Sequence, residues 1–185
     1  MARIPAATRE SVPQNQREAF DQIVQGLGSV PRYGPGSVLI NVPEASKRAT
    51  ALNQYLRNES SLPKKVQEFA MLVTAREKDC QHIWNAHAAS ANQAGVRDEV
   101  INALRDKKAL PNLAPDEEAV LNYARSLFRT HHASRGAFQA AMEQFGVQGL
   151  VELTLLLGNY AMLALAINAF DTDLPPERSE PLLPV

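Results

Sequence analysis

The residues between 68 and 87 combine side chains that can transfer protons with the single thiol of the chain. Glu68, Cys80 and His87 supply a carboxylate, a thiol and an imidazole. On a helix beginning near residue 80, residues three or four apart share one face. That face would carry Cys80, Ile83, Trp84 and His87. At 1.5 Å per residue the thiol and the imidazole would lie about 10 Å apart along the axis, too far for a direct ion pair but close enough to line one pocket.

Glu68 lies on an otherwise apolar face of the preceding helical pattern. An isolated buried charge is costly, so this carboxylate must be paired or must lie in a cleft. The ordinary interpretation of these residues is structural. Glu68 would pair with a cation, His87 would be a hydrogen-bonded histidine in the core beside Trp84, and Cys80 would be a small, unreactive apolar side chain. The candidate cations are Arg57, Lys64, Lys65 and Arg76. The convergence of the three groups is what favours a functional site.

The elements that must position these residues are helices. Apolar spacing and capping residues predict eight of them: a first from about 13 to 26, then 43–57, 63–78, 80–94, 98–104, one beginning at 115, 134–145 and 148–170. Residues 31–36 are predicted to form a loop, and residues 38–40 are the one short run that could be a strand. The sequence therefore predicts one all-α domain over residues 1–185, with a core over about 13–172 and a loosely ordered Pro-rich tail over 174–185.

Composition limits the class of protein. The 185 residues are 45% hydrophobic and 21% charged, which suits one soluble globular domain. Nineteen Lys and Arg against twenty Asp and Glu leave no basic stripe for nucleic acid. One cysteine excludes an intrachain disulfide and a CxxC pair. The N-terminal residues lack the apolar stretch of a secretory signal, so we expect a cytoplasmic protein.

Residues 153–170 carry no formal charge and reach the length of a membrane span. Polar residues such as Asn159 and Asn168 interrupt the run, and Glu152 and Asp171 bracket it without a flanking Lys or Arg. A helix that is apolar all round can also lie in a bundle core or an oligomer interface. We therefore expect a buried helix and no membrane partner.

Neither a metal nor an organic cofactor is expected. The four histidines form no HxxxH or HxxEH pattern, and Cys80 and His87 are badly spaced for one ion. His82 would point away from the Cys80 face of its helix. The glycines near residue 34 lack the Lys and the strand–helix context of a phosphate-binding loop.

The ordered pattern Glu68-x11-Cys80-x6-His87 is similar to that of the carboxymuconolactone decarboxylase and alkylhydroperoxidase D superfamily. Five segments resemble its decarboxylase-like branch: LPKKVQEFAMLVTAR, CQHIWNAH, AGVRDEVINAL, DEEAVLNYARSLF and GLVELTLLLGNYAMLALAINAF. The resemblance covers about residues 3–174. It implies an alkylhydroperoxidase D-like helical bundle whose pocket lies near subunit contacts in homo-trimers or homo-hexamers.

The resemblance implies two chemistries. In the peroxidase branch a CxxC pair reduces hydroperoxides, and the cysteine nearer the histidine attacks the peroxide. Ile83 stands at that position here, whereas Cys80 matches the resolving cysteine. A sulfenic acid would have no second thiol in the chain with which to condense. A one-cysteine peroxidase that uses Cys80 and an external thiol is the alternative that stays open.

The decarboxylase branch acts on a small lactone carboxylic acid from aromatic-ring catabolism, without a cofactor, and needs a general acid and a donor to the developing oxyanion. The resemblance favours His87 as the acid or base, with Glu68 orienting it. Trp84 would form an apolar wall, and Arg76 could hold the substrate carboxylate. Ile83 replaces a side chain that is often acidic or polar in that branch, so the substrate need not be the lactone. A third possibility is a non-catalytic oligomeric module that binds a small molecule.

Overall fold

The computed structural model describes residues 2–177 and 180–184, and it is helical throughout its regular elements. A short 3₁₀ helix, η1 (Gln14–Gln16), precedes eight α-helices: α1 (Arg17–Leu27), α2 (Gly34–Leu39), α3 (Pro43–Asn58), α4 (Lys64–Glu77), α5 (Gln81–Gln93), α6 (Asp98–Arg105), α7 (Pro115–Thr130) and α8 (Arg135–Phe170). No strand occurs among the described residues. The prediction of an all-α fold with about eight helices is confirmed.

Local sequence signals explain where many of these helices begin and end. Pro43 and Pro115 occupy the first turns of α3 and α7, where a missing N–H costs nothing. Ser134 caps α8 by accepting a hydrogen bond from the backbone N–H of Ala137 at 3.2 Å. Gly95 follows α5 with a φ of 101°, a left-handed conformation that glycine adopts without strain.

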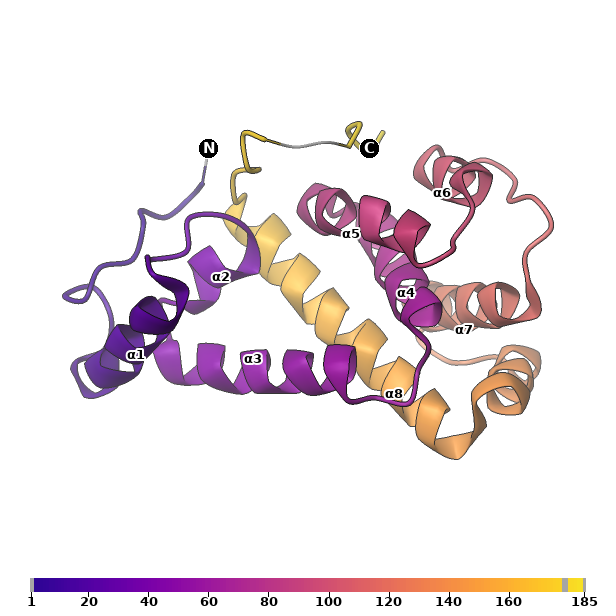
Figure 1. The fold of residues 1–185 in the computed structure, drawn as a ribbon, viewed down its shortest axis with the longest axis horizontal. Coiled ribbons are helices and arrows are strands. Elements are labelled where there is room, and N and C mark those ends of the chain that lie inside the picture. Colours follow the sequence, from indigo (N-terminus) through magenta and orange to yellow (C-terminus); the bar gives the residue numbers. More distant parts are fainter. Residues whose placement is uncertain (1, 178–179, 185) are drawn as a thin grey trace.

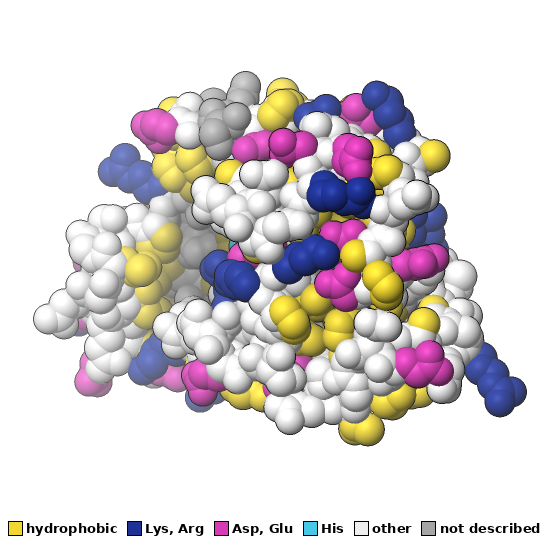
Figure 2. All heavy atoms as spheres, turned by 45° about the vertical axis from the view of Figure 1, so that its right-hand side comes forward, with side chains coloured by type: hydrophobic (Ala, Val, Ile, Leu, Met, Phe, Trp, Pro, Cys, Tyr) yellow, Lys and Arg dark blue, Asp and Glu magenta, His cyan; other side chains and the backbone are white. Residues whose placement is uncertain are grey.

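The core is built around α4. Every residue from Val66 to Arg76 in this helix is buried, and α4 packs against α5, α7 and α8. Figure 1 shows α8 crossing the molecule diagonally, with α1 to α3 on one side and α4 to α7 on the other. A smaller apolar cluster of Ala7, Val12, Phe20 and Ile40 holds the N-terminal segment to α1 and α2. On the face shown in Figure 2, Lys and Arg side chains lie among Asp and Glu rather than in one continuous patch.

The long helix α8 contains the apolar run that the sequence singled out. It is long and apolar enough to cross a membrane by length and composition, and 56% of its most apolar window is buried inside the protein. Gly146 departs from helical geometry, with a φ of 64° and a ψ of −176°. The helix bends there, close to the predicted break between residues 145 and 148 (Figure 1).

The structure corrects the prediction for residues 31–40. Residues 34–39 form the helix α2, where a loop and a possible strand were expected. Gly34 enters this helix with a φ of 61°, and Pro35 lies in its first turn. A three-residue apolar run is too short for its periodicity to distinguish a strand from a helix. Ile40, which is fully buried against the N-terminal cluster, holds the segment in place.

The C-terminal tail is more tightly held than the sequence suggested. Leu183 is 4% exposed and belongs to the main core. Its backbone N–H donates to the Gln81 side chain, and the Pro184 carbonyl accepts a hydrogen bond from Arg76. Residues 178–179 and 185 of the predicted loose tail lie outside the described residues.

Candidate functional site

Two adjacent helices bring a carboxylate and an imidazole into direct contact. Glu68 on α4 and His87 on α5 form a hydrogen bond of 2.8 Å between Oε2 and Nδ1. The Glu68 side chain is 0% exposed and that of His87 is 9% exposed, and we call these two residues the Glu68–His87 pair. Because Nδ1 is engaged by the carboxylate, Nε2 is the ring nitrogen left to exchange a proton with a bound molecule.

Two cations contact the second oxygen of Glu68. Lys64 Nζ lies 3.3 Å and Arg57 Nη2 lies 3.7 Å from Oε1. Burial alone would raise the pKa of Glu68, but the hydrogen bond and charge of His87, with the charge of Lys64, outweigh burial and lower it. Glu68 is therefore a carboxylate at neutral pH. Arg57 and Lys64 are themselves 37% and 51% exposed, so the carboxylate lies just beneath the surface.

One aromatic residue contacts the histidine, and a second lies one turn before it on α5. The Tyr160 ring on α8 meets the His87 ring edge to face, with centroids 5.3 Å apart and planes at 76°. Burial raises the pKa of Tyr160 to about 12, so its phenol stays neutral. Trp84 is 1% exposed in the core, and its indole N–H has no hydrogen-bond partner among the described residues; its role as an apolar wall of a pocket stays a prediction.

Cys80 is buried at the turn that precedes α5. Its side chain is 0% exposed, and burial raises the pKa of the thiol. Backbone hydrogen bonds from His82 and Ile83 lower the pKa of the thiol, but by less than burial raises it. The thiol is therefore protonated at neutral pH. Ile83, at the position where a peroxidase cysteine would attack, is 3% exposed.

His82 leaves the Cys80 face of α5, as the sequence predicted. Its ring occupies the space that a Cβ on Gly34 of α2 would need. Burial lowers the pKa of His82, so it packs there as a neutral imidazole. This contact explains why the chain has glycine at position 34.

The structure does not bring Arg76 to the Glu68–His87 pair. Arg76 lies in the last turn of α4, and its Nη1 donates to the carbonyls of Arg105 and Pro184 at 2.9 and 3.1 Å. Its Nη2 pairs with Asp79. Arg57 and Lys64 are the cations beside the pair instead. The sequence named both as possible partners of Glu68, but it gave no signal for Tyr160, which is distant along the chain.

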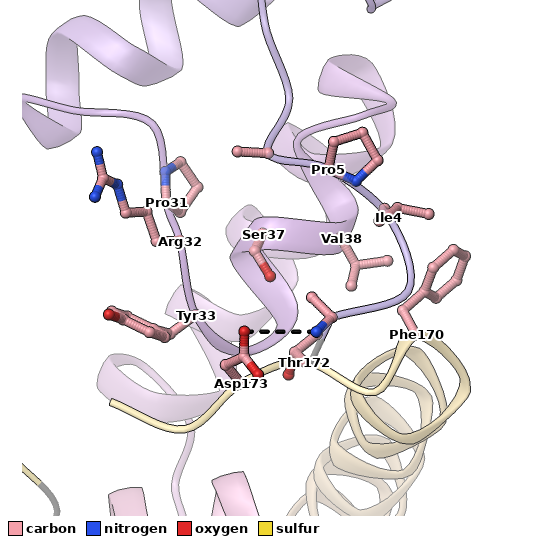
Figure 3. A pocket seen from close by; sticks show the side chains of 12 residues that line it. Ile4, Pro5, Pro31, Arg32, Tyr33, Ser37, Val38, Phe170, Thr172 and Asp173 are labelled. Carbon is pink, nitrogen blue, oxygen red and sulfur yellow. Dashed lines mark hydrogen bonds between the residues drawn. The ribbon is translucent and has the colours of Figure 1, made fainter. Parts of the chain in front are cut away.

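Five of the cavities in the surface of the described residues have volumes of about 320 to 540 Å³, and none of these five is lined by Glu68 or His87. The one in Figure 3, of about 340 Å³, lies between the N-terminal segment, α2 and the end of α8. Tyr33, Ser37, Val38 and Phe170 are among the side chains that line it. Within the described part of the chain, no three His, Cys, Asp or Glu side chains group as a metal site would require.

The site lies within a region that matches a known family. Residues 43–126 match the model of the Carboxymuconolactone decarboxylase family. This region runs from α3 into α7 and contains Glu68, Cys80 and His87. No curated protein matches the chain significantly.

Solved structures share the fold over nearly the whole chain. An uncharacterized peroxidase-related protein from Ralstonia eutropha JMP134, with an alkylhydroperoxidase AhpD core, is 17% identical over 95% of this chain and 93% of its own, with a TM-score of 0.71. A peroxidase-related protein from Silicibacter sp. TM1040 is 19% identical over 96% and 93%, with a TM-score of 0.68. A variant of the debrominase Bmp8 in complex with 2,3,4-tribromopyrrole is 13% identical over 95% of both chains, with a TM-score of 0.67. At these identities the likeness shows the fold and not the reaction.

Proposed function

We propose that this chain uses the Glu68–His87 pair for cofactor-free proton transfer, because residues 43–126 match the Carboxymuconolactone decarboxylase family and the fold is that of an alkylhydroperoxidase AhpD core. The substrate class is a small lactone or carbonyl compound that carries a carboxylate. The observation that supports this proposal most directly is the 2.8 Å hydrogen bond between the buried Glu68 carboxylate and Nδ1 of His87. It fixes the ring so that Nε2 can act as a general acid or base.

In the proposed reaction the bond between the substrate carbon and its carboxylate breaks, and CO₂ leaves. The electron pair passes to the conjugated carbonyl oxygen as an enolate. Protonated His87 then gives its Nε2 proton to carbon and becomes neutral, and it regains a proton from solvent. Glu68 holds Nδ1–H throughout and stabilises the imidazolium by its negative charge.

Two neighbouring cations suit a negatively charged substrate. Arg57 and Lys64 are partly exposed and extend toward Glu68, so each can also reach a carboxylate that approaches from solvent. Their charge would also stabilise the enolate oxygen, where negative charge develops. We therefore assign to Arg57 and Lys64 the role that the sequence suggested for Arg76.

The test is turnover of a panel of lactone carboxylates and β-keto acids, followed by CO₂ release. His87→Gln should lower the rate by about 10² to 10⁴, the contribution of a positioned acid. Glu68→Gln should also lower it, because the amide cannot neutralise the imidazolium. His132→Gln, at an exposed histidine, is the matched control. Full activity of His87→Gln, or no turnover of any panel compound by the wild type, would contradict the proposal.

One-cysteine peroxide reduction is less well supported by the geometry. That reaction requires a Cys80 thiolate that can reach the peroxide. The thiol is fully buried, and burial raises its pKa. Hydrogen bonds from the backbone N–H groups at the start of α5 favour a thiolate because they lower the pKa of Cys80, but this effect is smaller than the rise in pKa caused by burial.

We also propose that α8 mediates assembly into a homo-oligomer, a trimer or a hexamer. Five apolar residues of this helix are 41% to 69% exposed at spacings that place them on one face: Val147, Val151, Leu155, Met162 and Leu165. Tyr160, which contacts His87, is on the same helix but on its opposite, buried face, so α8 itself would lie between a second copy and the site. A contiguous exposed apolar stripe is costly in water and typical of an interface.

The mass in solution tests this assembly. Wild-type protein should elute as an oligomer in size-exclusion chromatography with light scattering, and Leu165→Glu should shift it to smaller species. Leu27→Glu introduces the same charge at a comparably exposed leucine of α1 and should leave the mass unchanged. A monomeric wild type would refute the proposed interface.

A further inference from the structure

A second charged site lies at the opposite end of α4 from Lys64. A cavity of about 430 Å³ is formed by the end of α4, the turn before α5, the segment after α6, and α7. We call it the cationic cavity, because five cationic side chains line it: Arg76, Lys107, Lys108, Arg125 and Arg129. Only two carboxylates, Glu77 and Asp79, line it with them. The cavity shares no residue with the Glu68–His87 pair.

The two carboxylates are already shared between cations. Glu77 accepts hydrogen bonds from Arg125 Nε at 3.0 Å and from Arg129 Nε and Nη2 at 2.7 and 2.6 Å. Asp79 pairs with the Arg76 guanidinium and lies 3.5 Å from Lys107 Nζ. Each of these two carboxylates therefore pairs with two cations. Lys108 Nζ lies 3.0 Å from Asp106, which is outside the lining, and the lining itself keeps an excess of positive charge.

One of the arginines that line the cavity has a buried donor without a partner. The Arg76 side chain is 3% exposed, and its Nε–H makes no hydrogen bond within the described residues. Buried polar groups in folded proteins are nearly always hydrogen-bonded. Lys108 and Arg129 are 71% and 57% exposed, so the cavity has both a buried cation and cations that reach into solvent.

Compensation of helix dipoles explains only part of this cluster. Cations in the last turn of a helix are stabilised by the negative end of its dipole, and Arg76 and Arg129 occupy such positions in α4 and α7. Lys107 and Lys108 lie beyond the end of α6, and Arg125 lies more than a turn before the end of α7. Their convergence with Arg76 in one hollow needs another explanation.

We propose that the cationic cavity binds a small oxyanion carrying two or more negative charges, such as a phosphate ester or a polycarboxylate. The forked donors of arginine match the paired oxygens of these groups. The volume is within the range of small-molecule sites. This site is distinct from the proposed reaction centre, and its occupancy does not depend on the reaction there.

Isothermal titration calorimetry at low ionic strength tests the proposal on the full-length protein, with inorganic phosphate and citrate as probes and acetate as a monovalent reference. One equivalent of phosphate or citrate per chain should bind more tightly than acetate. Arg125→Gln and the double variant Lys108→Gln/Arg129→Gln should each weaken this binding at least about tenfold, the usual effect of losing a charged hydrogen bond.

The matched control is Arg48→Gln. Arg48 is an exposed arginine that pairs with Glu44 at 2.7 Å, away from the cavity, and its replacement removes one positive charge, as Arg125→Gln does. Circular dichroism establishes that each variant is folded. No binding by the wild type, or equal weakening by Arg48→Gln and the cavity variants, would overturn the proposal. Neither readout requires turnover, so the result stands apart from the test of His87.

Discussion

The two oxygens of Glu68 have different partners, and this division explains how a fully buried carboxylate keeps its charge. Oε2 binds the His87 ring, whereas Oε1 lies near Lys64 and Arg57. Removal of one partner of a buried pair is strongly destabilising, because the remaining charge is uncompensated. The pair therefore has a structural as well as a chemical function, and activity of its variants must be measured on folded protein.

The burial of Cys80 predicts how fast its thiol reacts. Burial raises the pKa of its thiol, so its reaction with a disulfide reagent such as DTNB should be slow at neutral pH and reach half its limiting rate above pH 9. The same thiol should react at once in denaturant. Cys80→Ser should keep the turnover that His87→Gln loses. Rapid labelling at pH 7, or a sulfenic acid on titration with peroxide, would instead favour the peroxidase.

The spacing of Glu68 and His87 along the sequence is enough to predict that these two side chains meet. Glu68 and His87 lie on consecutive helices joined by a short turn, so their faces are bound to meet once the pattern of each helix is known. Tyr160 reaches His87 only through the packing of α8 on the earlier helices, which no local pattern encodes. Arg76 lies on the same helix as Glu68, but about two turns further along α4. Its guanidinium therefore bonds to the C-terminal tail and not to the pair.

Helix ends were predicted well where a cap or a proline marks them. Ser134, Pro115 and Gly95 lie at or next to the ends they predicted. The failure was α2, whose six residues include two glycines and a proline, a composition that usually indicates a loop. Burial of Ile40 against residues earlier in the chain outweighs this local preference, and that contact is not visible in the segment itself.

The bend in α8 gives a prediction for two glycines of one helix. Gly146 has a φ of 64° and a ψ of −176°, a region that only glycine occupies without strain. Gly146→Ala should therefore lower the free energy of unfolding by about 1–3 kcal/mol. Gly158 is helical, and a Cβ there would meet no atom within 4 Å, so Gly158→Ala should raise the free energy by about 0.5–1 kcal/mol.

Urea unfolding followed by circular dichroism measures both glycine variants against the wild type. The comparison holds because the same substitution is made within one helix, and only the backbone conformation of the glycine differs. Equal effects of the two substitutions would mean that residue 146 is helical in solution and that α8 is straight.

At the scale of the whole molecule, one buried carboxylate joins α3, the turn before α4, and α8. Glu152 is 3% exposed and accepts hydrogen bonds from the hydroxyl of Tyr55 at 2.8 Å and from Gln148 at 3.1 Å. The backbone N–H and hydroxyl of Ser61 donate to its other oxygen at 2.8 and 2.5 Å. These bonds hold α8 to α3 and to the turn between α3 and α4.

This network makes the stability of the protein depend on pH in a definite direction. Burial alone would raise the pKa of Glu152, but the hydrogen bonds from Ser61, Gln148 and Tyr55 outweigh it and lower the pKa from 4.5 to about 2. A carboxyl whose pKa is lower in the folded state stabilises the fold above its unfolded pKa, and this contribution is lost as the pH falls. The free energy of unfolding should therefore decrease between pH 4.5 and pH 2.

Glu152→Gln isolates the contribution of this carboxylate. An amide presents one acceptor oxygen and an N–H₂ group to donors that now bind two oxygens, so the variant should be less stable at pH 7 by about 1–3 kcal/mol. The difference from the wild type should shrink toward pH 2, because the wild-type carboxyl is then protonated too. Glu143→Gln, at an exposed position of the same helix, should leave both the stability and its pH dependence unchanged. A constant difference between Glu152→Gln and wild type from pH 7 to pH 2 would show that the charge of Glu152 does not stabilise the contacts of α8 with α3 and the turn before α4.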